Sequence, residues 1–537
     1  MKTSFQKDID SGNIIYVSDP SSLASRYLPD PATEESLRAL INEMASAGVD
    51  LFIQEAYTQG WTTYWRTEGF DYDARPQHRR FLPLLDQGKQ PLEILLDQCH
   101  KHNIRFAAGF RMNDNHGAVS TAQGVGAGAE FIVNNPRLQL SEAPPGANYQ
   151  ETTPLDFSNE EVRAFILSVV KRLIETFEVD GIEMCFRDQR YFPPDTGRER
   201  AHLLTELVAQ IRSALDDESG PGGQRRLLGA HVFATIEECQ YLGLDVPTWI
   251  EQGLVDYISP ADCMYAEFNL PYQEWSMLTS GSNCQFYPSM MPWTSNIARY
   301  RTGQQPMDQD QQRALAHTMY SQGANGISLY NHFEIMHGAG SAHAPFYPLA
   351  LHDSHHLRSD KQTLNGRRHY VFDATWGGYS GFLPDRTSTG ALKAQRAILE
   401  RPQGEDEYTF NIFEDISQSA AQLLFRGYHM TMQDHLEIKL NGRVLADTDF
   451  KRRDDEVRLD LRPETYTHDV YGPIAGEALS SEKRSCVTYW FPLTEQLSEY
   501  GTNRLSLRLI SSDPTATKSI IVEEVEVFVV PKPSFPQ

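Results

Sequence analysis

Short apolar runs alternate with amphipathic helical segments along roughly the first two thirds of the chain. Within residues 34–47, apolar side chains recur at spacings of three and four behind Thr33, which predicts a helix; residues 160–177 and 311–322 repeat this pattern. Eight runs rich in β-branched or aromatic residues are predicted strands: Asn13–Asp19, Val49–Ala56, Arg105–Met112, Gly181–Arg187, Leu228–Thr235, Asp256–Ala261, Gln285–Met290 and Gly326–Asn331. Eight strands alternating with helices predict an α/β fold, a (β/α)8 TIM barrel.

An open doubly wound sheet is the competing fold. It is disfavoured because the first strand is followed by Asp19-Pro20-Ser21-Ser22, where a phosphate-binding fold of that kind has a glycine-rich loop. Two connections are unusually long, residues 57–89 after the second strand and 113–158 after the third. Loops that follow strands form the catalytic face of a barrel, so their length indicates function there.

The pattern changes to period two after about residue 365. Alternating runs at 408–413, 436–440, 457–461, 486–491 and 505–510 are separated by turn residues, and Asn441-Gly442 is a strong hairpin signal. These features predict an antiparallel β-sandwich, jelly-roll-like in its succession of strands. The predicted domains are therefore a catalytic barrel over 1–350, a linker over 351–365 and a β-sandwich over 366–537.

Charge and composition narrow the classes of partner. The chain has 48 basic and 72 acidic side chains and a net charge of −24, which disfavours nucleic acids and anionic membranes. We find no apolar stretch of the ~20 residues that a membrane span needs, and the first residues lack the apolar segment of a secretory signal. Six widely spaced cysteines indicate reduced, buried thiols. A cytoplasmic protein is expected, and a homo-oligomer is compatible with the sequence.

Candidate chemistry gathers at the ends of the predicted strands, where side chains of a barrel share one mouth. Carboxylates ringed by aromatic and polar groups suit an oligosaccharide, because sugar rings stack on aromatics and glycosidic cleavage needs two carboxyl groups. The candidate catalytic residues are Glu183, Glu237, Asp114 and Asp262. The candidate substrate-binding residues are Glu55, Trp61, Arg111, Asn113, His116, Arg187, Tyr265, Trp293, Asn331 and His332.

Glu183 stands in the middle of a predicted strand, where a buried carboxylate is costly unless it is paired. Arg111 and Arg187 could supply that partner and keep Glu183 ionised, which favours Glu183 as nucleophile or base and Glu237 as acid. If the substrate were an acidic sugar, the fork of Arg111 would bind its carboxylate. Trp61 has a structural alternative, which is to close the top of the barrel together with its aromatic neighbours.

Four segments carry a resemblance to a known family. Arg111–His116 (RMNDNH), Val179–Phe186 (VDGIEMCF), Gly243–Asp256 and Gln322–Asn331 resemble, in order, the family-10-like glycosyl hydrolases of bacteria that degrade complex polysaccharides. The likeness runs from about Asn13 to Arg358. It implies a barrel hydrolase with an appended β-sandwich and a saccharide substrate.

The chain departs from that family pattern at Cys185, where the second acid of the motif is usually Asp. In barrel glycosidases that resemble the α-amylase clan, the nucleophilic Asp occurs at this offset, so its role would be lost here. The predicted seventh strand has no carboxylate either. The resemblance therefore leaves Glu183 as the leading acid.

Two other functions stay open. A metal-dependent sugar isomerase, epimerase or lyase would bind a divalent cation through residues such as Glu183, His231 and Asp262. A carbohydrate-binding protein with an inactive barrel is suggested by Cys185. The preferred hydrolase needs no cofactor, although the sequence leaves room for a divalent cation.

Overall fold

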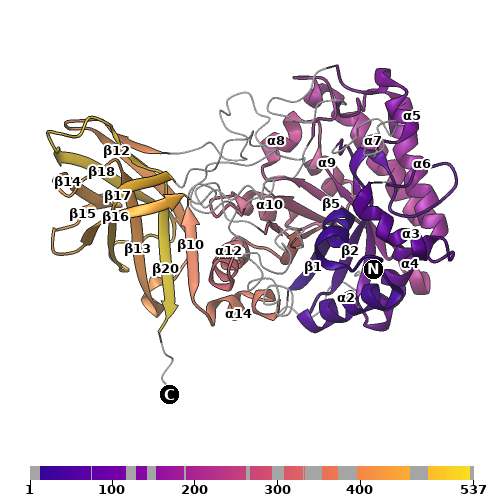
Figure 1. The fold of residues 1–537 in the computed structure, drawn as a ribbon, viewed down its shortest axis with the longest axis horizontal. Coiled ribbons are helices and arrows are strands. Elements are labelled where there is room, and N and C mark those ends of the chain that lie inside the picture. The colour runs from indigo at the N-terminus through magenta and orange to yellow at the C-terminus, as the bar shows by residue number, and fades with distance from the viewer. Residues whose placement is uncertain are drawn as a thin grey trace.

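The computed structural model shows a barrel and a β-sandwich side by side, with the N-terminal barrel in indigo to magenta and the sandwich in orange to yellow (Figure 1). Residues described by the structure are 12–73, 75–115, 128–141, 153–186, 189–261, 266–292, 307–330, 332, 354–372, 396–459 and 482–532. Within them, Cys99, Cys185, Cys239, Cys284 and Cys486 are buried thiols that form no disulfide, as predicted.

Nine short parallel strands form the barrel sheet, in the order β7-β6-β5-β4-β3-β2-β1-β9-β8. Every predicted run overlaps one of them, or two in the seventh run, which confirms the (β/α)8 barrel. There, β7 pairs with β6 and β8 with β9, and Pro288, which has no N–H to donate, lies between the two halves. The strands are β1 (Asn13–Ser18), β2 (Leu51–Tyr57), β3 (Arg105–Arg111), β4 (Gly181–Cys185), β5 (Leu227–Phe233), β6 (Tyr257–Ala261), β7 (Gln285–Phe286), β8 (Ser289–Met290) and β9 (Gly326–Tyr330).

Amphipathic helices cover the outside of this sheet. The predicted helix at 34–47 is confirmed by α2, where Thr33 and Ser36 cap each other's backbone N–H groups. The helices of the barrel region are α1 (Pro20–Ser22), α2 (Glu34–Ala47), α3 (Leu82–Leu85), α4 (Pro91–Lys101), α5 (Glu130–Val133), α6 (Glu160–Thr176), α7 (Gly197–Asp217), α8 (Ile236–Tyr241), α9 (Val246–Glu251), α10 (Tyr272–Thr279), α12 (Gln309–Ser321) and α14 (Asp360–Leu364).

Side chains inside the barrel are arranged in layers. One layer runs across neighbouring strands as Glu55, Gly109, Glu183, Gly229 and Tyr257. The two glycines alternate with the three large polar side chains, which gives those side chains room inside the barrel. A Cβ on Gly229 would lie 2.0 Å from the Tyr257 ring, and one on Gly109 would lie 3.0 Å from Cγ of Glu55. The glycines therefore decide which polar groups the barrel interior can hold.

The C-terminal strands form two antiparallel sheets, which confirms the predicted sandwich. One sheet has the order β10-β20-β13-β17-β16 with β11 and β19 beside it, and the other has the order β12-β18-β14-β15. Asn441 and Gly442 both have positive φ in the predicted hairpin turn. The strands are β10 (Arg368–Phe372), β11 (Ala397–Leu399), β12 (Glu405–Ile412), β13 (Ser419–Tyr428), β14 (His435–Leu440), β15 (Arg443–Val444), β16 (Lys451–Leu459), β17 (Glu482–Leu493), β18 (Gly501–Ser511), β19 (Ile520–Val522) and β20 (Val525–Pro531).

The sandwich packs against the barrel where β10 meets α12 and the loop that leads into α10 (Figure 1). The ring of Phe268, on the barrel side, lies 6.1 Å from that of Tyr370 and 6.2 Å from that of Phe372. Across the same interface, Nε2 of His317 lies 3.0 Å from the carbonyl oxygen of Phe413. Aromatic contacts and hydrogen bonds therefore hold the sandwich on the barrel.

We expect Phe268→Ala to lower the free energy of unfolding by about 3–5 kcal/mol, because it opens a cavity between the barrel and the sandwich. Phe131→Ala removes a ring that is 41% exposed and serves as the control. Equal melting temperatures for the Phe268 variant and the wild type in calorimetry would contradict the importance of this contact.

Candidate active site at the barrel mouth

A buried arginine, Arg111, lies at the centre of the barrel mouth, at the end of β3. Its Nε donates to Oε2 of Glu55 at 2.8 Å, and its Nη1 donates to Oδ2 of Asp114 at 2.6 Å. Its Nη2 donates to Oδ2 of Asp19 at 3.0 Å and to the hydroxyl of Tyr330 at 2.9 Å. Three carboxylates from three different parts of the chain therefore surround one guanidinium.

Local backbone features orient the side chains of this cluster. Asp19 ends the first strand and caps α1, because its Oδ1 accepts from the backbone N–H of Ser21 at 2.6 Å. A register shift after Glu55 interrupts the pairing of β2 with β3, and such irregularities re-aim side chains near active sites. Glu55 then lies against Gly109, on the side of β2 that faces β4.

The pKa values of Asp19 and Glu55 are shifted in opposite directions. Burial alone would raise the pKa of Asp19, but Arg111 and the Ser21 N–H bring it below its usual value. Burial raises the pKa of Glu55 to about 7, although Arg111 opposes the shift. Tyr330 also donates to Oε1 of Glu55 at 2.9 Å. Glu55 is thus a carboxylate oriented by two donors, which titrates near neutral pH.

Glu183 lies two strands from Glu55 in the same layer, and its surroundings differ. Its Oε2 has no hydrogen-bond partner among the described residues, and its Oε1 lies 3.9 Å from Nδ1 of His231. Burial raises the pKa of Glu183 to about 8; the nearby Tyr257 hydroxyl partly opposes this shift, and the charge of Glu55 adds to it. Glu183 therefore carries a proton at neutral pH.

This finding corrects the expectation that Arg111 keeps Glu183 ionised. Arg111 pairs with Asp19, Glu55 and Asp114 instead. Arg187, the other expected partner, lies outside the described residues. The sequence alone could not predict which of Glu55 and Glu183 pairs with Arg111, because both lie on strands next to β3.

Cys185 lies on the inner face of the barrel, as Glu183 does. In the sheet register it stands between Arg111 on β3 and His231 on β5. The ring of His231 in turn lies 4.8 Å from that of Tyr330. The position at which the family pattern has an acid therefore faces the mouth, but it holds a thiol.

Three predicted substrate-binding residues, Asn113, Trp61 and His332, have structural contacts in place of the predicted role. Asn113 donates to the carbonyl oxygens of Leu155 and Arg190, and it accepts from the Leu155 N–H, so its amide is used to hold loops. Trp61 is 1% exposed and packs in the core. His332 hydrogen-bonds to the Met290 carbonyl, and burial lowers its pKa to about 4.

Glu237 is exposed, unlike the buried candidates Glu183 and Asp114. It lies in the first turn of α8, which Thr235 caps by accepting from the Glu238 N–H. In the part of the chain that the structure describes, Glu237 has no hydrogen bond or ion pair with Glu183, Glu55 or Asp114. The remaining predicted site residues lie outside the described residues: His116, Arg187, Asp262, Tyr265, Trp293 and Asn331.

Sequence reasoning did not single out Asp19, Tyr257 or Tyr330 as functional. Asp19 ends the first predicted strand, so the rule that strand ends carry function could have found it. Tyr257 and Tyr330 lie on predicted strands, in a pattern that equally fits an apolar core. Their contacts with Glu183 and Glu55 appear only when the strands are placed side by side.

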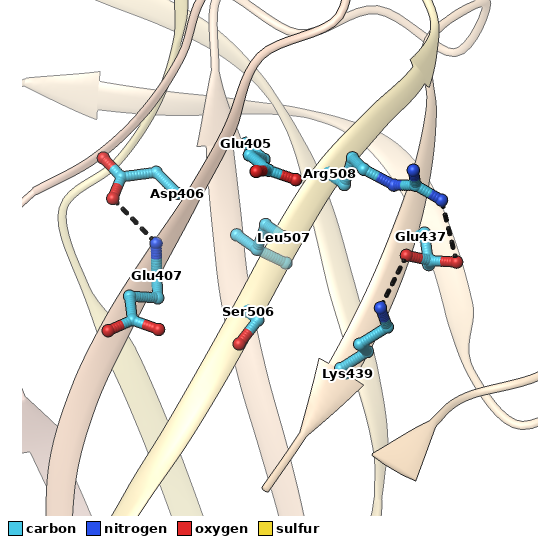
Figure 2. A pocket seen from close by; sticks show the side chains of 8 residues that line it. All are labelled: Glu405, Asp406, Glu407, Glu437, Lys439, Ser506, Leu507 and Arg508. Atoms are coloured by element: carbon cyan, nitrogen blue, oxygen red, sulfur yellow. Dashed lines mark hydrogen bonds and ion pairs between the residues drawn. The ribbon is translucent and has the colours of Figure 1, made fainter. Parts of the chain in front are cut away.

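A hollow on the sandwich offers no comparable site. It lies on the outer face of the four-stranded sheet, where Glu437 is paired with Arg508 at 3.2 Å and with Lys439 at 3.0 Å (Figure 2). Paired charges on an open sheet face are typical of a solvated surface. We therefore place the candidate site in the barrel.

Among the described residues, no group of three or more His, Cys, Asp or Glu side chains could hold a metal ion. Asp262 and His116 lie outside those residues. None of the helices in the described ranges combines the length and the apolar character that crossing a bilayer requires.

Comparisons with known proteins point to glycoside hydrolases. No family model matches the chain. It is 22% identical over 261 residues to the glycosyl hydrolase YngK of Bacillus subtilis (strain 168), a match that covers 40% of this chain and 44% of YngK. The chain thus spans less than half the length of this curated relative.

Solved structures match the chain at low identity and with low TM-scores. The α-amylase of Geobacillus thermoleovorans is 9% identical, with a TM-score of 0.37 and coverage of 93% of this chain and 98% of the amylase. The trehalose-6-phosphate hydrolase of Bacillus licheniformis is 11% identical, with a TM-score of 0.38 and coverage of 94% and 100%. Similarity at this level assigns neither a substrate nor catalytic residues to the chain.

Replacing Glu183 by Gln should change how stability depends on pH. Its pKa is about 8 in the folded protein, against 4.5 for an ordinary glutamate. The stability that comes from this raised pKa is complete below the ordinary value and is lost as the pH rises through the folded value. We expect the free energy of unfolding of the wild type to fall relative to Glu183→Gln between pH 4.5 and about 8.

Denaturant unfolding at several pH values checks this expectation. The exposed Glu237, replaced by Gln, is the control and should give a curve parallel to that of the wild type. Parallel curves for Glu183→Gln and the wild type would show that Glu183 titrates as an ordinary surface glutamate.

Proposed function

We propose that the protein is an O-glycoside hydrolase, with Glu183 as general acid and Glu55 as nucleophile or base. The observation that carries this proposal is the pair of inward carboxyl groups in one layer with opposite surroundings. Glu183 is buried and has no arginine partner among the described residues, whereas Glu55 accepts hydrogen bonds from Arg111 and Tyr330. Groups whose surroundings separate their pKa values in this way are typical of acid and base assignments.

The spacing of the strands supports this pairing. Glu55 and Glu183 are separated by Gly109 alone, and neighbouring strands lie ~4.8 Å apart, so the two Cα atoms are about 10 Å apart. Both side chains belong to the layer inside the barrel, and Cγ of Glu55 lies against Gly109. One sugar ring can therefore lie within reach of both carboxyl groups.

In the proposed reaction, Glu183 gives its proton to the glycosidic oxygen as the bond to the anomeric carbon breaks. The carboxylate of Glu55 either attacks the anomeric carbon or takes a proton from the water that does so. The positive charge that develops on the sugar ring is stabilised by the carboxylates around Arg111. This reaction uses carboxyl groups alone, and oligosaccharides derived from complex polysaccharides are the proposed substrates.

Substitution of the two glutamates tests their roles. Glu183→Gln and Glu55→Gln should each lower kcat on an oligosaccharide by ~10²–10⁴-fold. An aryl glycoside with a good leaving group needs no protonation, so it should restore turnover by Glu183→Gln and not by Glu55→Gln. Steady-state kinetics with Glu237→Gln as the control check this pattern. Rescue of Glu55→Gln instead would reverse the two roles.

The pH dependence of turnover follows from the same assignment. Glu55 must be ionised, and its pKa is about 7; Glu183 must be protonated, and its pKa is about 8. Activity should therefore rise through the first value and fall through the second, which gives a narrow bell. With an aryl glycoside the alkaline limb should weaken. A profile that stays flat across this range would contradict the pairing.

One observation favours a second candidate function. Cys185 faces the mouth where the family pattern has an acid, which is compatible with a barrel that binds sugars without cleaving them. Calorimetric binding of oligosaccharides without any release of reducing ends would support that function over hydrolysis.

A further inference from the structure

We propose that the sugar bound beside Glu183 is uncharged, and that the carboxylates around Arg111 exclude uronic acids and other anionic sugars. The inference rests on the proposed function and extends it to the class of substrate. It replaces the expectation that Arg111 binds the carboxylate of an acidic sugar. Three observations support it. Arg111 already donates to protein oxygens, the cluster around Arg111 and Arg75 has a negative net charge, and one oxygen of Glu183 has no hydrogen-bond partner among the described residues.

Most N–H groups of Arg111 already donate to oxygen atoms of the protein. A guanidinium has five N–H groups, and four of them donate to Asp19, Glu55, Asp114 and Tyr330 over 2.6–3.0 Å. A bidentate contact with a substrate carboxylate needs two parallel donors on one edge. Because each edge of this guanidinium already holds protein oxygens, a uronate would have to displace a buried carboxylate.

The second arginine near the mouth, Arg75, is also committed. Its Nε donates to both oxygens of Asp73, at 3.0 and 3.1 Å, and its Nη2 donates to Ser21 and Gln59 at 2.8 and 2.7 Å. The cluster around these two arginines contains four carboxylates, from Asp19, Glu55, Asp73 and Asp114. Two positive charges therefore meet three negative ones in this cluster even when Glu55 is protonated.

Glu183 has a carboxyl oxygen that is available to a bound sugar. Its Oε2 is buried on the inner face and has no hydrogen-bond partner among the described residues. As a protonated carboxyl, it can donate to a hydroxyl or to the glycosidic oxygen of a neutral sugar. An anionic group beside it would meet the negative charge of the cluster in a site that water screens poorly. Neutral sugars satisfy Glu183 without that repulsion.

Matched substrates that differ only at C6 test the inference. The probes are the p-nitrophenyl gluco-, galacto- and mannopyranosides with a hydroxymethyl group, and the same glycosides with a carboxylate. For each pair of which either member is cleaved, we expect kcat/KM to be at least ~10-fold higher for the neutral member, which corresponds to about 1.4 kcal/mol. Isothermal titration of the parent sugars and their uronic acids gives a readout that does not depend on turnover.

Asp114→Asn removes one negative charge from the cluster with little change in shape. It should therefore lower the ratio of kcat/KM for the neutral member to kcat/KM for the charged member. Asp245→Asn, in the helix cap of α9, is the matched control and should leave the preference unchanged. Equal or better binding of the uronates by the wild type would overturn the inference and leave the hydrolase intact. If none of these sugars is bound or cleaved, and no oligosaccharide is either, the proposed function fails and the inference fails with it.

Discussion

The charge of Arg111 is the constraint on which the barrel mouth depends. A buried guanidinium is stable only when carboxylates and other acceptors surround it, and this one has Asp19, Glu55 and Asp114 within hydrogen-bonding distance. These partners come from the end of β1, from β2 and from the loop after β3. The ion cluster therefore ties together three consecutive segments of the barrel at its functional end.

The same constraint separates the two glutamates of the layer. Arg111 and Tyr330 donate to Glu55 and support its ionised form, whereas burial outweighs the nearby Tyr257 hydroxyl at Glu183 and raises its pKa to about 8. The glycines of the layer, Gly109 and Gly229, leave the space in which the large polar side chains stand. The difference in surroundings between Glu55 and Glu183 thus follows from the reach of Arg111 and from the space that the two glycines leave.

The β-sandwich contributes to stability through a different kind of contact. Phe268 packs on two aromatic side chains of β10, and a pair between Arg368 and Glu414, both 1% exposed as side chains, lies at the junction. Breaking a buried pair of this kind costs more than the pair itself contributes, because it leaves one charge without a partner. The sandwich is accordingly built into the fold rather than attached by a flexible tether.

Local patterns in the sequence were sufficient to predict the positions of several helices and strands. The helix at 34–47, the eight strand positions and the Asn441-Gly442 hairpin depend on side chains within one segment, and the structure confirms them. Strand-end reasoning also named Glu55, Arg111 and Glu183. Only the tertiary structure decided that Arg111 pairs with Glu55 and not with Glu183, because that choice depends on side-chain direction across strands far apart in the chain.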